Sequence, residues 1–447
     1  MARKKRKNRK RQKSLRPSPD QINALVNLYH SGQMIPAEQA CRELLQTYPQ
    51  SLTILNVFGA VLASQDQLMP AVQVFDQIIR LQPDDAEAYN NRGVVFKELG
   101  QLEEAMASYD QAIPLQPDLA QAHSNLSLVL LLLGDLRNGW PEYEYGKLKK
   151  KVPRRVLPAP YQLWNGEPLE DKVILVTTEQ GVGDEVMFAS CIPDLINLHP
   201  KQIILECDFR LVPLFERSFP QLNIQASRDC KDVHWLKELG DIDFQIAVGS
   251  LPGFFRQELS HFPASRSFLK PAPELLSEWR NRYAKIGKEL KIGLSWSGGK
   301  DKKVKRIRSI DLPSWEPIFR SGAHFVNLQY GDHSEEISQL ELETGIHIYD
   351  WDDANPLVGL DSFAAQIVAL DLVISVDNST VHIAGAVGTP VWVLTPYNPD
   401  WRWMLERNNS PWYSTVRLFR QQKIGDWNGV INEISTKLQM MVRQNGG

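Results

Sequence analysis

The first third of the chain consists of amphipathic segments that recur at an interval of 34 residues. Apolar residues return every three or four positions in the stretches 86–99 and 102–113, which predicts one helix for each. The interval is repeated by proline, alanine, aromatic and glycine positions, namely Pro49, Pro83 and Pro117, Ala37, Ala71 and Ala105, Phe75 and Tyr109, and Gly59 and Gly93. Helix pairs of this period stack and bury a shared core. The pattern therefore predicts an α-solenoid over residues 17–150.

A different pattern begins after residue 158. Short β-branched runs alternate with helical segments, and these runs are residues 173–176, 203–205, 244–248, 291–296, 325–328, 372–376 and 391–394. Runs that are apolar on both faces and separated by helices indicate parallel sheets covered on each side. We expect two Rossmann-like halves, 158–285 and 286–447. Ligands of such folds bind beyond the carboxyl ends of the strands, so two facing halves would share a cleft.

Composition narrows the class of protein. The 447 residues are 43% hydrophobic and 23% charged, which is typical of globular chains and excludes a mainly disordered one. The longest apolar run, 128–133, is far too short to span a membrane, and the basic start has no apolar core of a secretory signal. No C-x-x-C pair occurs among Cys41, Cys191, Cys207 and Cys230, so we expect a cytoplasmic protein without structural zinc or disulfides.

The net charge of −3 hides an uneven distribution. Ten of the 50 Lys and Arg residues lie among residues 1–16, which contain no acid, so the remainder holds 40 bases against 53 acids. We interpret residues 1–16 as a disordered basic tail. Such a tail can attract anionic lipid, which would place the protein at the membrane periphery, or RNA through its phosphates.

Two strand-to-helix turns carry candidate chemistry. The first follows the run 173–176 and contains Gly181 and Gly183, which allow a tight turn, and Asp184 at the start of a helix. Asp184 is either a helix cap or a catalytic base. The third glycine of the dinucleotide fingerprint and the glycines of the P-loop are absent, so neither a dehydrogenase nor an ATPase is indicated.

The second turn follows the run 372–376 and places a helix start directly after a strand. Its polar residues are Asp377, Asn378, Ser379, Thr380 and His382. The amino end of a helix carries partial positive charge and free N–H groups, which suit a diphosphate. The alternative is structural, with Asp377 and Asn378 as caps and His382 as a packed histidine.

The repeat positions resemble the tetratricopeptide repeat, with copies at 18–51, 52–85 and 86–119 and a degenerate fourth copy from about 120 to 150. Such stacks bind peptides in a concave groove. Position six is Asn23, Asn91 and Asn125 in three of the four units. Similar asparagine ladders hold acceptor proteins in O-linked N-acetylglucosamine transferases, although asparagine is also simply frequent at this position.

The whole pattern resembles bacterial tetratricopeptide proteins with a heptosyltransferase-like region, a glycosyltransferase of the GT-B type. The stretches that carry the resemblance are 134–135, 139–144, 163–169, 179–184, 293–298, 308–310, 377–382, 384–392, 399–403, 410–413 and 417–421. The resemblance implies a nucleotide-sugar substrate, no cofactor and no metal. It also implies that Asp184 is the base that deprotonates the acceptor hydroxyl, and that Arg308 binds the donor phosphates.

The family's Asp-Thr-x-x-x-His pattern corresponds here to residues 377–382, where Asn378 replaces the usual threonine. Asp241 and Asp243 have the form of the metal motif of another glycosyltransferase architecture, but we expect no metal there. Trp401 and Trp403 either stack on a base or sugar or pack in the core.

These observations predict an inverting, metal-independent glycosyltransferase. It would transfer a sugar from a nucleotide sugar to a protein or glycan, with the repeats recruiting the acceptor or a partner. The alternative is a non-catalytic scaffold in which the repeats bind a partner protein and the glycosyltransferase-like region is degenerate.

Overall fold

The computed structural model describes residues 16–149, 161–178, 181–226, 236, 239–264, 267–299, 302–351, 353 and 355–445. The predicted basic tail, apart from Arg16, and Cys230 lie outside these residues. The chain forms two compact units. One holds the described residues up to Val129 together with 148–149, and the other holds 130–147 and the α/β region.

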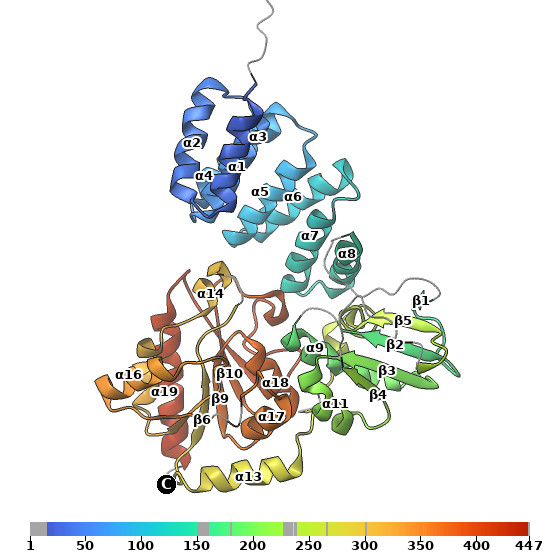
Figure 1. The fold of residues 1–447 in the computed structure, drawn as a ribbon, viewed down its shortest axis with the longest axis vertical. Coiled ribbons are helices and arrows are strands. Elements are labelled where there is room, and N and C mark those ends of the chain that lie inside the picture. The colour runs from blue at the N-terminus through green and yellow to red at the C-terminus, as the bar shows by residue number, and fades with distance from the viewer. Residues whose placement is uncertain are drawn as a thin grey trace, which may run out of the picture. The chain divides into compact units, whose positions relative to one another are not determined.

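The predicted helix pairs are present and keep the interval of the sequence (Figure 1). Their bounds are α1 Pro19–His30, α2 Met34–Thr47, α3 Leu52–Ser64, α4 Leu68–Leu81, α5 Ala86–Glu98, α6 Leu102–Leu115, α7 Ala120–Leu133 and α8 Leu136–Lys149. The second helices of the four pairs thus begin at 34-residue steps, from Met34 to Leu136. The predicted α-solenoid is confirmed.

The repeated glycines allow the two helices of a pair to approach. A β-carbon on Gly93 would lie 2.5 Å from the ring of Tyr109, and one on Gly59 would lie 2.6 Å from the ring of Phe75. Both contacts are too short for real carbon atoms, so each aromatic ring occupies the space that a side chain would need. The repeated glycine and aromatic positions therefore reflect the close packing of the two helices within each repeat.

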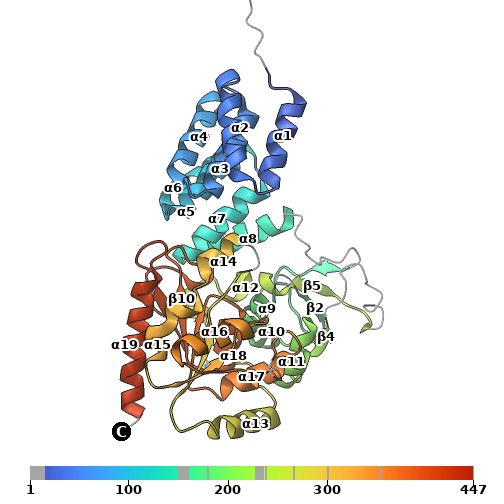
Figure 2. The same cartoon turned by 60° about the vertical axis from the view of Figure 1, so that its left-hand side comes forward.

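The first half of the α/β region contains a parallel sheet of five strands in the order β1-β5-β2-β3-β4. The strands are β1 Gln162–Leu163, β2 Val173–Thr177, β3 Gln202–Cys207, β4 Asn223–Ala226 and β5 Phe244–Ala247. The helices of this half are α9 Val182–Phe188, α10 Ile192–Ile196, α11 Val212–Ser218 and α12 Pro252–Phe255. Figure 2 shows them beside the sheet. Every predicted run of this half forms a strand, because its residues are buried on both faces.

The second half contains a parallel sheet of six strands in the order β11-β10-β9-β6-β7-β8. The strands are β6 Lys291–Ser295, β7 His324–Asn327, β8 Ile348–Tyr349, β9 Leu372–Val376, β10 Val391–Thr395 and β11 Val416–Arg420. The helices are α13 Pro273–Ala284, α14 Lys302–Arg308, α15 Glu316–Phe319, α16 Ser334–Thr344, α17 Leu360–Val368, α18 Ser379–Val387 and α19 Trp427–Asn445. If β6 is numbered 1 and β11 is numbered 6, the order from β8 to β11 is 3-2-1-4-5-6, the order of doubly wound nucleotide-binding folds.

Residues 136–147 of α8, the last helix of the solenoid, belong to the second unit. Trp140 and Tyr143 of α8 pack against Trp401, with ring centroids 5.5 and 6.1 Å apart. The indole Nε1 of Trp140 donates to the carbonyl oxygen of Arg256 at 2.9 Å. The two compact units therefore divide within α7, whereas the sequence predicted a boundary near residue 150.

Among the described residues, no helix combines the length and the apolar composition that crossing a membrane requires.

Candidate functional site

The two predicted turns meet at the carboxyl ends of the two sheets. In the second half, β6 and β9 are neighbouring strands. The strands that follow β6 extend the sheet on one side, and those that follow β9 extend it on the other, so the gap between them is the switch point where such folds bind ligands. A β-carbon on Gly183 of α9 would lie 3.0 Å from His382 Cδ2 and 3.4 Å from Ser379 Cα, so α9 and the start of α18 are in close contact.

A cleft of about 370 Å³ lies at this junction, a volume typical of small-molecule sites. It is lined by every catalytic and donor-binding residue that the sequence predicted, namely Gly181, Gly183, Asp184, Arg308, Asp377, Asn378, Ser379, Thr380 and His382. The sequence did not predict two further charged residues of the cleft, Arg402 and Arg210, of which Arg210 pairs with Asp208 at 2.8 Å. Nor did it predict the wall that includes Tyr330, Leu360 and Phe363.

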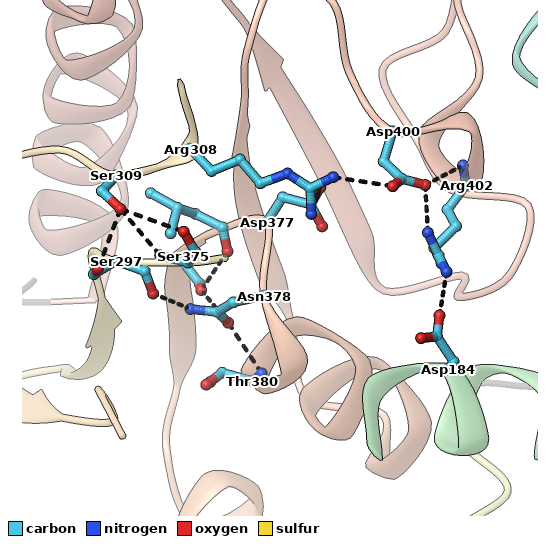
Figure 3. A network of polar contacts seen from close by, with 12 residues as sticks. Asp184, Ser297, Arg308, Ser309, Ser375, Asp377, Asn378, Thr380, Asp400 and Arg402 are labelled. Carbon is cyan, nitrogen blue, oxygen red and sulfur yellow. Dashed lines mark hydrogen bonds and ion pairs between the residues drawn. The ribbon is translucent and has the colours of Figure 1, made fainter. Parts of the chain in front are cut away.

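Charged side chains form a continuous series through the cleft, in the order Asp184, Arg402, Asp400, Arg308 and Asp377 (Figure 3). We call this series the ion-pair chain. Asp184 of the first half contacts Arg402 of the second half. Asp400 lies 2.5 Å from Arg402 Nη1 and 3.0 Å from Arg308 Nη2, and Arg308 Nη1 lies 3.1 Å from Asp377.

Burial and neighbouring charge act in opposite directions on these groups. Burial would raise the pKa of Asp400, but Arg402 and Arg308 hold it well below its usual range. Burial raises the pKa of Asp377, because Arg308 compensates only part of the lost hydration. Asp377 and Asp400 raise the pKa of Arg308, and Asp184 and Asp400 raise the pKa of Arg402. Both arginines therefore stay charged.

The loop after β6 positions Arg308. Gln329 Oε1 accepts hydrogen bonds from the backbone of Trp296 at 3.0 Å and of Ser297 at 2.8 Å, which fixes this loop. The backbone N–H of Ile310 donates to the Trp296 carbonyl at 2.9 Å, and this ties the end of α14 to the same loop. Arg308, the last residue of α14, is thereby held beside α18.

Asn378 is the N-cap of α18 and its side chain is fully engaged. Its Oδ1 accepts from the Thr380 backbone at 3.0 Å, and its Nδ2 donates to Ser295 Oγ at 2.7 Å and to the Ser297 carbonyl at 3.1 Å (Figure 3). The asparagine thus joins α18 to the end of β6. A threonine has too few hydrogen-bonding groups to make these contacts, which accounts physically for the departure from the family pattern.

His382 is buried in the first turns of α18. Its Nδ1 lies 3.0 Å from Tyr413 Oη, and its ring stacks on Trp403 at 5.5 Å. Burial, assisted by Arg402, lowers the pKa of His382 to about 4, so its ring is neutral near pH 7. Thr380 Oγ1 lies 3.4 Å from the Leu328 carbonyl oxygen, whereas Ser379 is partly exposed at the cleft.

Trp401 and Trp403 are core residues, with 6% and 0% of their surface exposed. The structure therefore favours the packing alternative for both tryptophans. Arg402 between them was missed because no strand-to-helix turn marks it. The available signal was its position in the stretch 399–403, which the family resemblance already included.

The predicted groove asparagines lie in the first unit. Asn125 Nδ2 donates to Asn90 Oδ1 at 2.9 Å, and Asn90 Nδ2 donates to Asn91 Oδ1 at 3.3 Å. Asn23 is exposed. Asn90, which the sequence analysis did not single out, therefore connects two of the three ladder positions.

The Asp241-x-Asp243 pair lies at the amino end of the first sheet. Asp243 accepts from the backbone of Val173 at 2.8 Å and pairs with Lys172 at 3.0 Å. It thereby fixes the start of β2, and its position is at the edge opposite the carboxyl ends of the strands.

Comparison with known proteins gives matches for both parts of the chain. Residues 74–107 match the tetratricopeptide repeat family, and residues 95–134 match a TPR repeat family. Protein FlbA of Caulobacter vibrioides is 34% identical over 313 residues, which cover 67% of this chain and 52% of FlbA. The chain thus aligns with about half the length of this relative.

Solved structures are similar at low identity. MamA 41-end from Desulfovibrio magneticus RS-1 is 21% identical with a TM-score of 0.28, and the match covers 30% of this chain and 75% of that one. A glycosyl transferase family 9 structure from Veillonella parvula DSM 2008 is 14% identical with a TM-score of 0.46. The match covers 62% of this chain and 100% of that one.

The fold assignment depends on the helix pairs and the strand orders of this chain. Two parallel sheets, with a cleft at their carboxyl ends, constitute the GT-B arrangement. The chain therefore combines tetratricopeptide repeats with an α/β region of the GT-B architecture, the fold of one large group of glycosyltransferases.

Proposed function

We propose that this protein is a glycosyltransferase that moves a sugar from a nucleotide sugar to a protein or glycan acceptor. One observation carries the proposal: Asp184 of the first half and the start of α18 of the second half line the same cleft. A carboxylate facing an anion-binding helix end is what acceptor deprotonation and diphosphate departure require.

The proposed chemistry is a direct displacement with inversion at the sugar carbon. Asp184 takes the proton of the acceptor hydroxyl, the acceptor oxygen bonds to the sugar carbon, and the bond from that carbon to the phosphate oxygen breaks. The nucleoside diphosphate leaves with the electron pair. Arg308, Arg402 and the N-terminus of α18 supply the positive charge that stabilises it, so the proposal assigns this role to protein groups rather than to a metal ion.

The repeats fit a recruiting role for a protein acceptor. Tetratricopeptide stacks bind extended peptides, and amide side chains can donate to and accept from a peptide backbone at once. Asn90, Asn91 and Asn125 form a connected amide series in the first unit, which supports this role.

Donor binding is the first test. We expect one nucleotide sugar in a panel to raise the unfolding temperature of the protein, since a ligand at a hundred times its Kd adds ~2.7 kcal/mol of stability. That donor should then be hydrolysed or transferred. Asp184→Asn should reduce turnover by about 10²–10⁴ while donor binding persists, because a general base contributes about that much to the rate. Unchanged turnover would remove Asp184 from the mechanism.

A non-catalytic scaffold is the second candidate. One observation favours it, because Asp184 is paired with Arg402 in the ion-pair chain and is not free. Stabilisation by a nucleotide sugar without hydrolysis or transfer would support this candidate and contradict the transferase proposal.

A further inference from the structure

The proposed base is held by a cation of the opposite half. Asp184 Oδ1 contacts Arg402 Nη2, and only 20% of the aspartate side chain and 13% of the arginine side chain are exposed. Arg402 Nη2 occupies a hydrogen-bonding position of Asp184 Oδ1 that an incoming acceptor hydroxyl would need. The acceptor hydroxyl therefore competes with Arg402 for this carboxylate.

The backbone around Arg402 is fixed, so its guanidinium group is the part that can move. Asp400 Oδ1 accepts from the Arg402 backbone N–H at 3.2 Å. Arg420 Nη2 donates to the carbonyl oxygens of Trp403 at 2.7 Å and Met404 at 2.5 Å. Arg402 Nε is buried without a hydrogen-bond partner, so the guanidinium retains an unused donor.

Both Nη groups of Arg402 already face carboxylates of the ion-pair chain, so a phosphate oxygen that takes Nη2 must displace Asp184. The three carboxylates of the ion-pair chain outnumber its two guanidinium groups, and every guanidinium faces a carboxylate. Asp400 contacts both arginines and a backbone N–H, and Asp377 is 3% exposed beside Arg308. Asp184 contacts Arg402 and, weakly at 3.4 Å, the Gly181 amide. The contact between Asp184 and Arg402 is therefore the easiest to exchange for a phosphate oxygen.

We propose that Arg402 is a donor-binding residue that keeps Asp184 inactive until the diphosphate of the nucleotide sugar takes its guanidinium group. The donor then binds first, and its binding frees the carboxylate that deprotonates the acceptor. This inference rests on the proposed transferase function and adds an order of binding to it.

A double-mutant cycle on the full chain tests the exchange. Inorganic pyrophosphate is the probe, with ADP, CDP, GDP and UDP as fuller mimics, and calorimetry gives the Kd. Asp184→Asn should tighten pyrophosphate binding about tenfold, because Arg402 no longer has to leave a carboxylate. Arg402→Gln should weaken binding about tenfold. In the Arg402→Gln background, Asp184→Asn should have no further effect.

Two additions make the cycle decisive. Arg402→Met also removes the positive charge and keeps an unbranched side chain, so it repeats the cycle if Arg402→Gln does not fold. Glu335→Gln on the exposed face of α16 removes the same charge elsewhere and should leave the Kd unchanged.

The outcomes separate this inference from the proposed function. If Asp184→Asn has no effect, or tightens binding equally with and without Arg402, Arg402 does not exchange partners and the inference is wrong, while the transferase proposal stands. If the wild-type protein binds neither pyrophosphate nor any of the four nucleoside diphosphates, the proposed function itself fails.

Discussion

A single glycine sets how closely the two halves of the α/β region approach. A β-carbon on Gly183 would meet His382 Cδ2 at 3.0 Å and the Ser379 backbone at 3.4 Å, whereas one on Gly181 would find its nearest atom at 3.9 Å. Gly183→Ala should therefore destabilise the protein by about 1–3 kcal/mol, the usual cost of overpacking, and reduce turnover by separating α9 from α18. Gly181→Ala is the matched control. Equal unfolding temperatures for the two variants would contradict this account.

Glu185, the neighbour of Asp184, makes stability depend on pH. Burial, with Asp208 and Glu206 adding to it, raises the pKa of Glu185 from 4.5 to about 7. Because the folded protein holds this proton more tightly than the unfolded chain, the contribution of Glu185 to stability is fully present below about pH 4.5 and is lost as pH rises through about 7.

Glu185→Gln removes that dependence and keeps an oxygen for the Asp208 N–H, which donates to Glu185 Oε2 at 2.8 Å. We expect the variant to gain up to about 3 kcal/mol over the wild type at pH 8 and nothing below pH 4.5. Urea unfolding across this pH range measures the difference, with exposed Glu335→Gln as the control. A constant difference between variant and wild type at every pH would contradict the prediction.

At the scale of elements, α8 connects the repeat pattern to the site. Trp140 contacts Trp401, which directly precedes Arg402 in the chain. Trp140→Ala should cost about 3–5 kcal/mol, because it empties a buried space in the second unit. It should also weaken pyrophosphate binding by loosening the segment that presents Arg402.

The matched change in the first unit is Tyr109→Ala, which removes a ring with 0% exposure from the helix pair α5 and α6. It should lower stability without affecting pyrophosphate binding. Calorimetric unfolding and pyrophosphate titration of both variants test this. If the two variants weaken pyrophosphate binding equally, the proposed link between α8 and Arg402 is wrong.

Local patterns predicted the elements whose residues repeat or stay apolar throughout. The strand runs 173–176 and 372–376 were found because every residue of β2 and β9 is buried. Four strands were not predicted. The strands β1 and β8 are only two residues long, β4 is only partly buried, and β11 carries Arg417 and Arg420 among its apolar residues.

The same limit applies to the site. Asp184 and the start of α18 follow strands directly, so a helix start after a strand identified them. Arg402 lies in a short 3-10 helix, Trp401–Trp403, and its partner Asp184 is 218 residues away in the chain. No periodicity encodes a contact of that range, because only the meeting of the two halves creates it.

For the whole molecule, the two compact units allow ligand effects to be assigned. All the residues proposed to bind donor lie in the second unit, so a nucleotide sugar at a hundred times its Kd should stabilise that unit by ~2.7 kcal/mol and leave the first unchanged. Calorimetry of the full chain should show one unfolding transition moving upward with donor. Tyr109→Ala identifies the transition of the first unit, which should stay in place. If donor raises the temperatures of both transitions together, the repeats take part in donor binding. The assignment of recruitment to the repeats and of donor binding to the cleft alone is then wrong.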